Sequence, residues 1–260
     1  MSPNILRFIH NLDTIIGLEF RRLFTSRSGL LYLFAFSFFW FIMLKFVIVN
    51  VSDLIALQNP DKDWSETVFN TYFNISLYLF PLLCIFIAAN QTGADRERGT
   101  LRFLLMRSSR DEIFFSRFLA QVSIQYFLIL LTAISTVLVG FYVQGFAVEA
   151  IYNAAIMVTN LAIALLPFIA LMALLSAGLK SAKQATICAA LIWAMASGII
   201  TGISHYFPFV EPLKMLIPGM QFTSLSDLDG LAMFSLAYIP LLQTAALLIA
   251  GRFIMQRTAV

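Results

Sequence analysis

The chain has 260 residues, of which 60% are apolar and only 12% are charged, with a net charge of +3. An average soluble domain carries about 25% charged residues, and the mean hydropathy of this chain is +0.86. The composition excludes a soluble globular domain and predicts an all-α integral membrane protein. Cys84 and Cys188 lie inside apolar runs, which favours buried thiols over a disulfide framework or a metal site.

Apolar side chains recur three and four residues apart through residues 5–24, with Arg7, Asp13 and Arg21 on the other side. This spacing is typical of an amphipathic helix that lies in the plane of the membrane interface. A cytosolic helix packed on a partner protein is the alternative. The interfacial helix is favoured because the first membrane span begins only a few residues later.

Apolar windows long enough to cross the membrane follow, since a hydrocarbon core of about 30 Å requires about 20 residues of helix. We place six spans at residues 29–50, 68–90, 118–143, 151–178, 185–204 and 231–251. We treat residues 1–260 as a single transmembrane domain.

Basic residues are distributed unequally between the loops. If the two termini and the loops at 91–117 and 179–184 share one side, that side holds 14 of the 17 Lys and Arg residues. The other side then holds eight of the 14 acidic residues. Because cytoplasmic loops are enriched in Lys and Arg, we expect both termini in the cytoplasm. Topology therefore explains the basic residues, and we expect no nucleic-acid partner.

Residues 205–230 are too apolar for a free loop and too often broken by proline and glycine to form a span. Such backbone at membrane depth must be buried in protein or line a cavity. We predict a short re-entrant hairpin at the outer side, before the sixth span. Its candidate residues are Phe207, Pro208, Phe209 and Pro218. An interfacial loop anchored by its aromatic residues is the alternative.

Small residues recur every four positions in the fifth window, at Ala190, Ala194, Gly198 and Gly202. A stripe of this kind lets another helix approach closely and forms a candidate helix-packing face. The partner helix belongs either to the same chain or to a second copy, and the pattern leaves both open.

Motifs for chemistry are missing from the sequence. It contains no G-x-x-x-x-G-K-[ST] phosphate loop, no H-E-x-x-H zinc helix and no G-x-S-x-G turn. No charged residue lies in the middle of a predicted span, which argues against an ion-coupled transporter. We expect no catalytic residue, no metal ligand and no cofactor bound by this chain, and an energy source outside it.

The most charged stretch, residues 91–117, holds ten of the 31 charged residues and lies between two uncharged runs. Its sequence includes Asp95-Arg96-Glu97-Arg98-Gly99-Thr100-Leu101, followed by Leu104-Leu105 and Ser108-Ser109-Arg110. This pattern, together with the order of the predicted elements, resembles the ABC-2 type transporter permeases. The chain departs from that family where Ser108 and Ser109 replace a proline turn and where Arg117 replaces the usual lysine.

The resemblance implies the membrane subunit of a type V-like ABC exporter in the bacterial inner membrane. In that family two permeases, as a homodimer or heterodimer, pair with two separate ATPase subunits that bind ATP and Mg²⁺. The loop between the second and third spans forms a coupling helix that docks on the ATPase. The resemblance assigns this coupling role to Glu97, Arg98, Gly99, Thr100, Leu101, Leu104 and Leu105.

The residues of the loop agree with such a role. Leu101, Leu104 and Leu105 form an apolar patch that suits a groove on a partner, although a loop that only fixes topology is an alternative. We expect ATP hydrolysis in trans to drive export of an amphipathic or lipid-linked substrate. A permease of the same fold that supports maturation or assembly of another protein is one alternative. A stand-alone membrane enzyme or pore is the alternative from another class.

Overall fold

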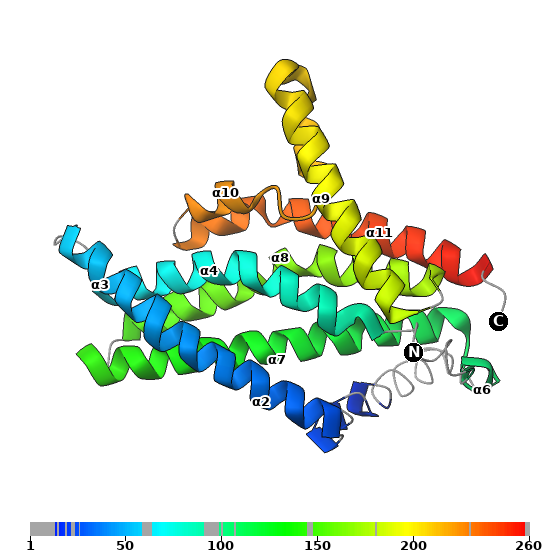
Figure 1. Ribbon diagram of the computed structural model, residues 1–260, viewed down its shortest axis with the longest axis horizontal. Coiled ribbons are helices and arrows are strands. Elements are labelled where there is room, and N and C mark those ends of the chain that lie inside the picture. Colours follow the sequence, from blue (N-terminus) through cyan, green and yellow to red (C-terminus); the bar gives the residue numbers. More distant parts are fainter. Residues whose placement is uncertain are drawn as a thin grey trace, which may run out of the picture.

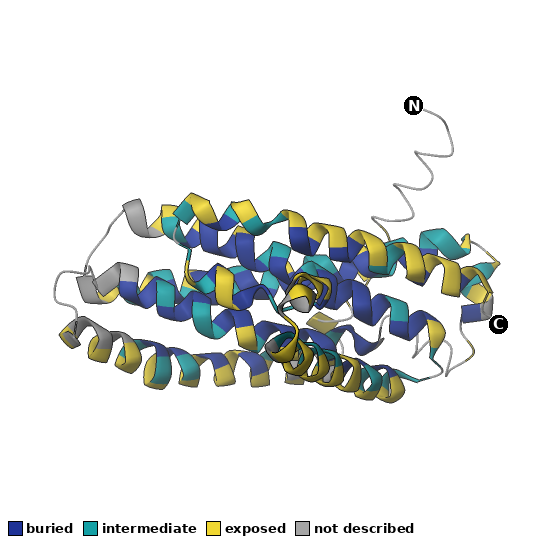
Figure 2. Cartoon of the chain, turned by 90° about the horizontal axis from the view of Figure 1, so that it is seen from above, coloured by how far each residue is buried: buried dark blue, intermediate teal, exposed yellow. Residues whose placement is uncertain are grey.

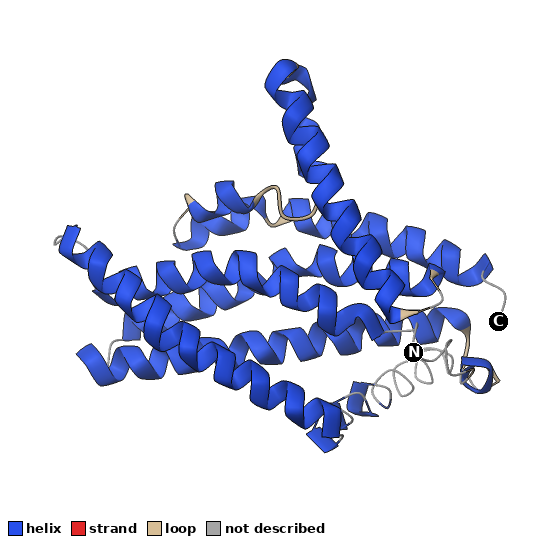
Figure 3. Ribbon diagram, viewed as in Figure 1, coloured by secondary structure: helices blue, strands red, loops and turns tan. Residues whose placement is uncertain are grey.

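The fold is that of a computed structural model of the full chain. The structure describes residues 14, 16–18, 20–21, 24–25, 27–58, 64–90, 99, 101–106, 108–144, 148–179, 181–228 and 230–257. Every regular element among these residues is helical, which confirms the predicted all-α class (Figure 3). The predicted interfacial helix at 5–24 falls largely outside the described residues.

The helices follow one another along the chain with short connections. The first membrane helix is continuous through α2 (Arg27–Ile42), the π-helical segment η1 (Met43–Ile48) and α3 (Val49–Gln58). Next come α4 (Trp64–Ile87), the 3-10 turn η2 (Ala88–Asn90), α6 (Leu101–Leu105), α7 (Arg110–Gln144) and α8 (Val148–Gly178). The last elements are α9 (Ala182–Tyr206), η3 (Pro208–Leu216), α10 (Phe222–Ser226), η4 (Gly230–Leu236) and α11 (Tyr238–Arg257).

Six of the described helices are long and apolar enough to cross a membrane, which confirms the predicted number of spans. They cover Leu33–Val51, Thr67–Ile87, Arg110–Tyr142, Ile151–Gly178, Ala182–Ser204 and Gly230–Arg257. The third helix differs from the prediction, because α7 begins at Arg110 and not near residue 118. Residues 110–117, assigned from the sequence to the charged loop, are therefore the first turns of a membrane helix.

Helix α8 forms the centre of the bundle and packs against α4, α7 and α11. In its most apolar stretch 72% of the residues are buried, compared with 6% in α9. Figure 1 shows the reason: α9 projects away from the bundle, whereas α8 is flanked by other helices. Buried residues gather along the inner faces of the packed helices (Figure 2). The outer faces are apolar too, as expected for a protein surrounded by lipid.

Trp40 attaches α2 to the rest of the bundle. Its ring meets the ring of Tyr72 on α4 edge to face, with centroids 5.7 Å apart, and its Nε1 donates to Ser135 Oγ on α7 at 3.1 Å. The Tyr72 hydroxyl in turn lies 3.1 Å from Thr132 Oγ1 on α7. Interhelical hydrogen bonds of this kind stabilise helix contacts where lipid gives no hydrophobic driving force.

Three short helical pieces, η3, α10 and η4, lie between α9 and α11, and a turn at Gly219 joins η3 to α10. This glycine has a φ of +91°, and a Cβ there would lie 3.1 Å from Phe168 Cζ. The turn therefore requires glycine. The Phe222 ring stacks on Phe168 of α8 with centroids 6.0 Å apart and meets Tyr78 of α4 at 5.9 Å. These contacts hold the predicted hairpin against the bundle.

Candidate coupling site

The short helix α6 lies at one end of the bundle, just before α7 (Figure 1). Gly99, two residues before α6, is exposed and has a φ of +70°, a left-handed conformation that favours glycine. Leu101 at the start of α6 is only 1% exposed and belongs to the bundle core. Leu104 and Leu105 are half-buried and pack against the same core. Burial of these leucines fixes α6 to the bundle.

The exposed apolar side chains of α6 are not the predicted ones. Phe103 is 67% exposed, and Met106, directly after the helix, is 80% exposed. Leu101, by contrast, points into the core. Phe103 and Met106, which no sequence pattern singled out, form the apolar surface at this end. The remaining predicted coupling residues, Glu97, Arg98 and Thr100, lie outside the described residues.

A reciprocal pair of hydrogen bonds begins α7. The backbone nitrogen of Ser109 donates to Glu112 Oε2 at 2.9 Å, and the backbone nitrogen of Glu112 donates to Ser109 Oγ at 3.2 Å. This is a capping box, which satisfies two amide groups that a helix start leaves without partners. Asp111 and Glu112 in the first turn also favour the positive end of the helix dipole. These contacts explain why α7 begins before the uncharged run.

Polar contacts join the start of α7 to the end of α11. Arg110 Nη1 donates to the carbonyl oxygens of Met255 at 3.2 Å and Gln256 at 2.8 Å. Asp111 Oδ2 forms an ion pair with Arg252 Nη2 at 2.7 Å, and Gln256 Nε2 donates to Asp111 Oδ1 at 3.2 Å. We call this set, Arg110, Asp111, Arg252 and Gln256, the α7–α11 lock. It binds carbonyl groups that the last turn of a helix leaves without partners.

The substitution Arg110→Gln should loosen the last turn of α11. It removes two hydrogen bonds from a charged donor, and such bonds contribute about 1.5–3 kcal/mol each. We expect amide hydrogen exchange in residues 252–257 to accelerate roughly tenfold, measured by mass spectrometry. Lys183→Gln, which removes an exposed cation from α9, serves as the control and should leave that exchange unchanged.

The family model described as ABC-2 family transporter protein matches residues 14–250, which is most of the chain. The chain belongs to this family. A comparison with curated proteins gives no match. The family match confirms the resemblance seen in the sequence and agrees with six membrane-spanning helices. The chain is therefore an ABC-2 membrane permease, and α6 occupies the loop between its second and third spans.

The small-residue stripe of the permease lies on an uncovered face of α9. Ala190, Ala194, Gly198 and Gly202 are all exposed. A Cβ added at Gly198 or Gly202 would have no described atom within 4 Å. Among the described residues, no span of the same chain packs on this stripe, and packing against a second copy stays a prediction.

The predicted residues of the outer hairpin divide into two groups. Phe207 and Phe209 are exposed, and their rings lie 5.9 Å apart. The carbonyl oxygen of Pro218 accepts a hydrogen bond from Trp193 Nε1 of α9 at 2.9 Å. Pro208 is the first residue of η3. Phe207 and Phe209 therefore lie outside the bundle, whereas Pro218 connects the hairpin to α9.

Proposed function

We propose that this permease is the membrane subunit of an ATP-driven exporter and that a separate ATPase subunit docks on α6. Supporting the proposal are the family membership and the lack of a phosphate loop in the sequence. The single observation that carries it is the arrangement of α6. Leu101 is buried in the bundle while Phe103 and Met106 are exposed beside it. A partner that binds Phe103 and Met106 thereby pushes on a helix that is attached to the core.

The α7–α11 lock transmits a displacement of α6 to other helices of the bundle. Helix α6 is followed at once by α7, and Arg110 and Asp111 connect α7 to the end of α11. Both helices pack on α8. Displacement of α6 therefore moves α7, α8 and α11 together. Helix α9 is mostly uncovered and packs less extensively on α8 than α7 and α11 do. Relative motion between the α7–α8–α11 unit and α9 is the step that would open a path through the membrane.

The complete transporter contains two permeases and two ATPase subunits in this proposal. The second permease, a copy of this chain or a related one, packs on the stripe from Ala190 to Gly202. ATP and Mg²⁺ bind to the ATPase subunits. The distribution of Lys and Arg supports a cytoplasmic location for α6 and both termini, and the membrane in this proposal is the bacterial inner membrane. An outward path then carries an amphipathic or lipid-linked substrate.

Co-expression with the ATPase encoded beside this permease tests the proposal. We expect the permease to purify as a complex with the ATPase and to stimulate its rate of ATP hydrolysis. The variant Gly99→Val should lower that stimulation at least fivefold, because a β-branched residue is strained at a φ of +70°. Gly230→Val is the matched control, since Gly230 also has a positive φ, +58°, and begins η4, which is not part of α6.

Two outcomes would contradict the proposal. One is a permease that remains monomeric and does not retain the ATPase in detergent or in nanodiscs. The other is a complex in which Gly99→Val and Gly230→Val reduce ATP hydrolysis equally, because the effect would then arise from loss of stability. A chain that acts without nucleotide would favour a stand-alone pore or enzyme.

A further inference from the structure

The side-chain amide of Gln125 on α7 is buried without a hydrogen bond. The residue is only 1% exposed, and neither Nε2 nor Oε1 has a hydrogen-bond partner among the described residues. Gln125 lies well inside the span Arg110–Tyr142, where the surrounding hydrocarbon offers no hydrogen-bonding group. A buried amide without partners is costly. The packing around Gln125 therefore carries a cost in free energy that another arrangement of the helices would relieve.

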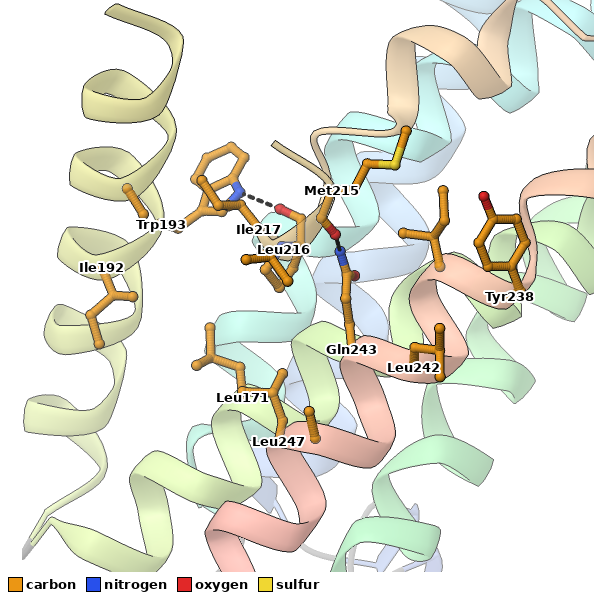
Figure 4. A pocket seen from close by; sticks show the side chains of 14 residues that line it. Leu171, Ile192, Trp193, Met215, Leu216, Ile217, Tyr238, Leu242, Gln243 and Leu247 are labelled. Atoms are coloured by element: carbon orange, nitrogen blue, oxygen red, sulfur yellow. Dashed lines mark hydrogen bonds between the residues drawn. The ribbon is translucent and has the colours of Figure 1, made fainter. Parts of the chain in front are cut away.

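Other side-chain donors in the membrane spans bind backbone carbonyl groups. Gln243 Nε2 on α11 donates to the carbonyl oxygen of Met215 at 2.6 Å, and Trp193 Nε1 on α9 donates to that of Pro218 at 2.9 Å. Figure 4 shows both bonds. Gln125 has the same amide group as Gln243, so a backbone carbonyl that lacks a donor is the acceptor that suits it.

Pro81 creates such an acceptor in α4. Proline has no backbone N–H, so the carbonyl oxygen of Leu77, four residues earlier, lacks the donor that a regular helix would supply. Leu77 is 0% exposed and belongs to the core of the bundle. Helix α4 thus has, inside the core, a carbonyl group without its helical donor.

Contacts of Tyr72 on α4 show how α4 and α7 lie along each other. The Tyr72 hydroxyl donates to the carbonyl oxygen of Ile129 at 3.4 Å and lies 3.1 Å from Thr132 Oγ1. Gln125, Ile129 and Thr132 share one face of α7, because helix residues four and seven apart lie on the same side. As consecutive spans, α4 and α7 cross the membrane in opposite directions. Gln125 is therefore level with the α4 residues between Tyr72 and Pro81.

We propose that Gln125 and Pro81 form a conformational switch between α4 and α7. In the packing of this structure, Nε2 of Gln125 has no acceptor. In a second packing, a bend of α4 at Pro81 brings the carbonyl oxygen of Leu77 to Nε2, and proline is a common site of helix bending. The unpaired amide lowers the preference for the first packing, as a two-state element requires. The switch belongs to the permease alone and requires no ATPase, so it is independent of the proposed function.

The variant Gln125→Met tests the switch, because methionine has a similar length and no amide. We expect the melting temperature of the purified permease in nanodiscs to rise by about 2 °C or more, since an unpaired polar group leaves the core. Amide hydrogen exchange in residues 78–85, measured by mass spectrometry, should slow at least about fivefold, since the bent packing becomes less populated. Gln184→Met, at an exposed position of α9, is the control and should change neither quantity.

A double-mutant cycle with Pro81→Ala identifies the acceptor. Alanine supplies the missing N–H to the carbonyl oxygen of Leu77, which is then no longer available to Nε2. In the Pro81→Ala background, Gln125→Met should change exchange in residues 78–85 less than about twofold. Pro167→Ala is the matched control, because it also removes a proline from the interior of a span, α8, and should leave the effect of Gln125→Met intact.

Several results would overturn the switch. A lower melting temperature of Gln125→Met would show that the amide is already paired in the folded permease. Unchanged exchange in residues 78–85 would show that no second packing depends on the amide. An effect of equal size with and without Pro81→Ala, or one lost only with Pro167→Ala, would exclude Leu77 as the acceptor. If Gln125→Met gives too little protein, Gln125→Leu is a second apolar replacement that carries the same test.

Discussion

The double substitution Phe103→Asp and Met106→Asp should abolish binding of the ATPase subunit while the permease remains folded. Both side chains are exposed in the isolated chain, at 67% and 80%, so charged replacements lose no core packing. In a complex, however, the same side chains would be buried, and each such contact contributes about 2 kcal/mol or more when it lies at the centre of an interface.

We therefore expect the dissociation constant of the ATPase to rise by at least about a hundredfold. The measurement is binding of the purified ATPase to the permease in nanodiscs, with the melting temperature of the permease recorded in parallel. ATP hydrolysis should fall to the rate of the ATPase alone.

The matched control is Leu54→Asp together with Leu57→Asp. These leucines are 61% and 81% exposed on α3, which lies at the end of the bundle opposite α6 (Figure 1). The control carries the same change in charge and should leave binding within a factor of two. If the α3 variant loses binding as completely as the α6 variant, the docking surface is not α6.

Hydropathy predicted the number of spans because the thickness of the bilayer imposes a minimum length on each apolar window. It does not predict which face of a span is buried, because lipid and protein core are both apolar. Phe34 and Phe36 on α2 illustrate this, since Phe34 is 75% exposed and Phe36 is 5% exposed. For the same reason the sequence did not reveal that Leu101 of α6 is buried and Phe103 is exposed.

The polar contacts at the start of α7 differ in how far a sequence reveals them. The Ser109-x-x-Glu112 spacing is a local signal of a helix start and would have placed the beginning of α7 correctly. The bonds from Arg110 to Met255 and Gln256 join positions that are far apart in the chain. No local pattern marks such a pair. Hence the candidate site was located by motif, whereas its connection to α11 required the structure.

The glycines likewise show that a sequence pattern does not predict which positions are tightly packed. The four-residue spacing of α9 drew attention to Gly198 and Gly202, yet a Cβ added at either position would meet no described atom within 4 Å. The tight glycine is Gly251 of α11, which belongs to no such pattern. A Cβ there would lie 2.7 Å from Phe114 Cζ and 3.2 Å from the Cα of Leu174. Gly251 therefore permits the close packing of α11 on α7 and α8.

Gly251→Val should destabilise the permease strongly. Phe114 is fully buried, so its ring has little room to move, and the backbone of α8 at Leu174 limits the space on the other side. Overpacking of this kind typically costs about 1–3 kcal/mol. We expect a lower melting temperature in detergent and a smaller yield of monodisperse protein. Gly140→Val on α7 is the control, since no described atom lies within 4 Å of a Cβ at that position.

A second substitution separates a steric clash from a general effect of valine in the helix. Phe114→Leu shortens the side chain that the new Cβ would meet, so Gly251→Val combined with Phe114→Leu should be more stable than the sum of the two single losses predicts. Simple additivity would show that Phe114 and Gly251 do not interact. Because Phe114 lies one turn after Arg110, the same double variant should restore slow hydrogen exchange at the end of α11, which Gly251→Val alone accelerates.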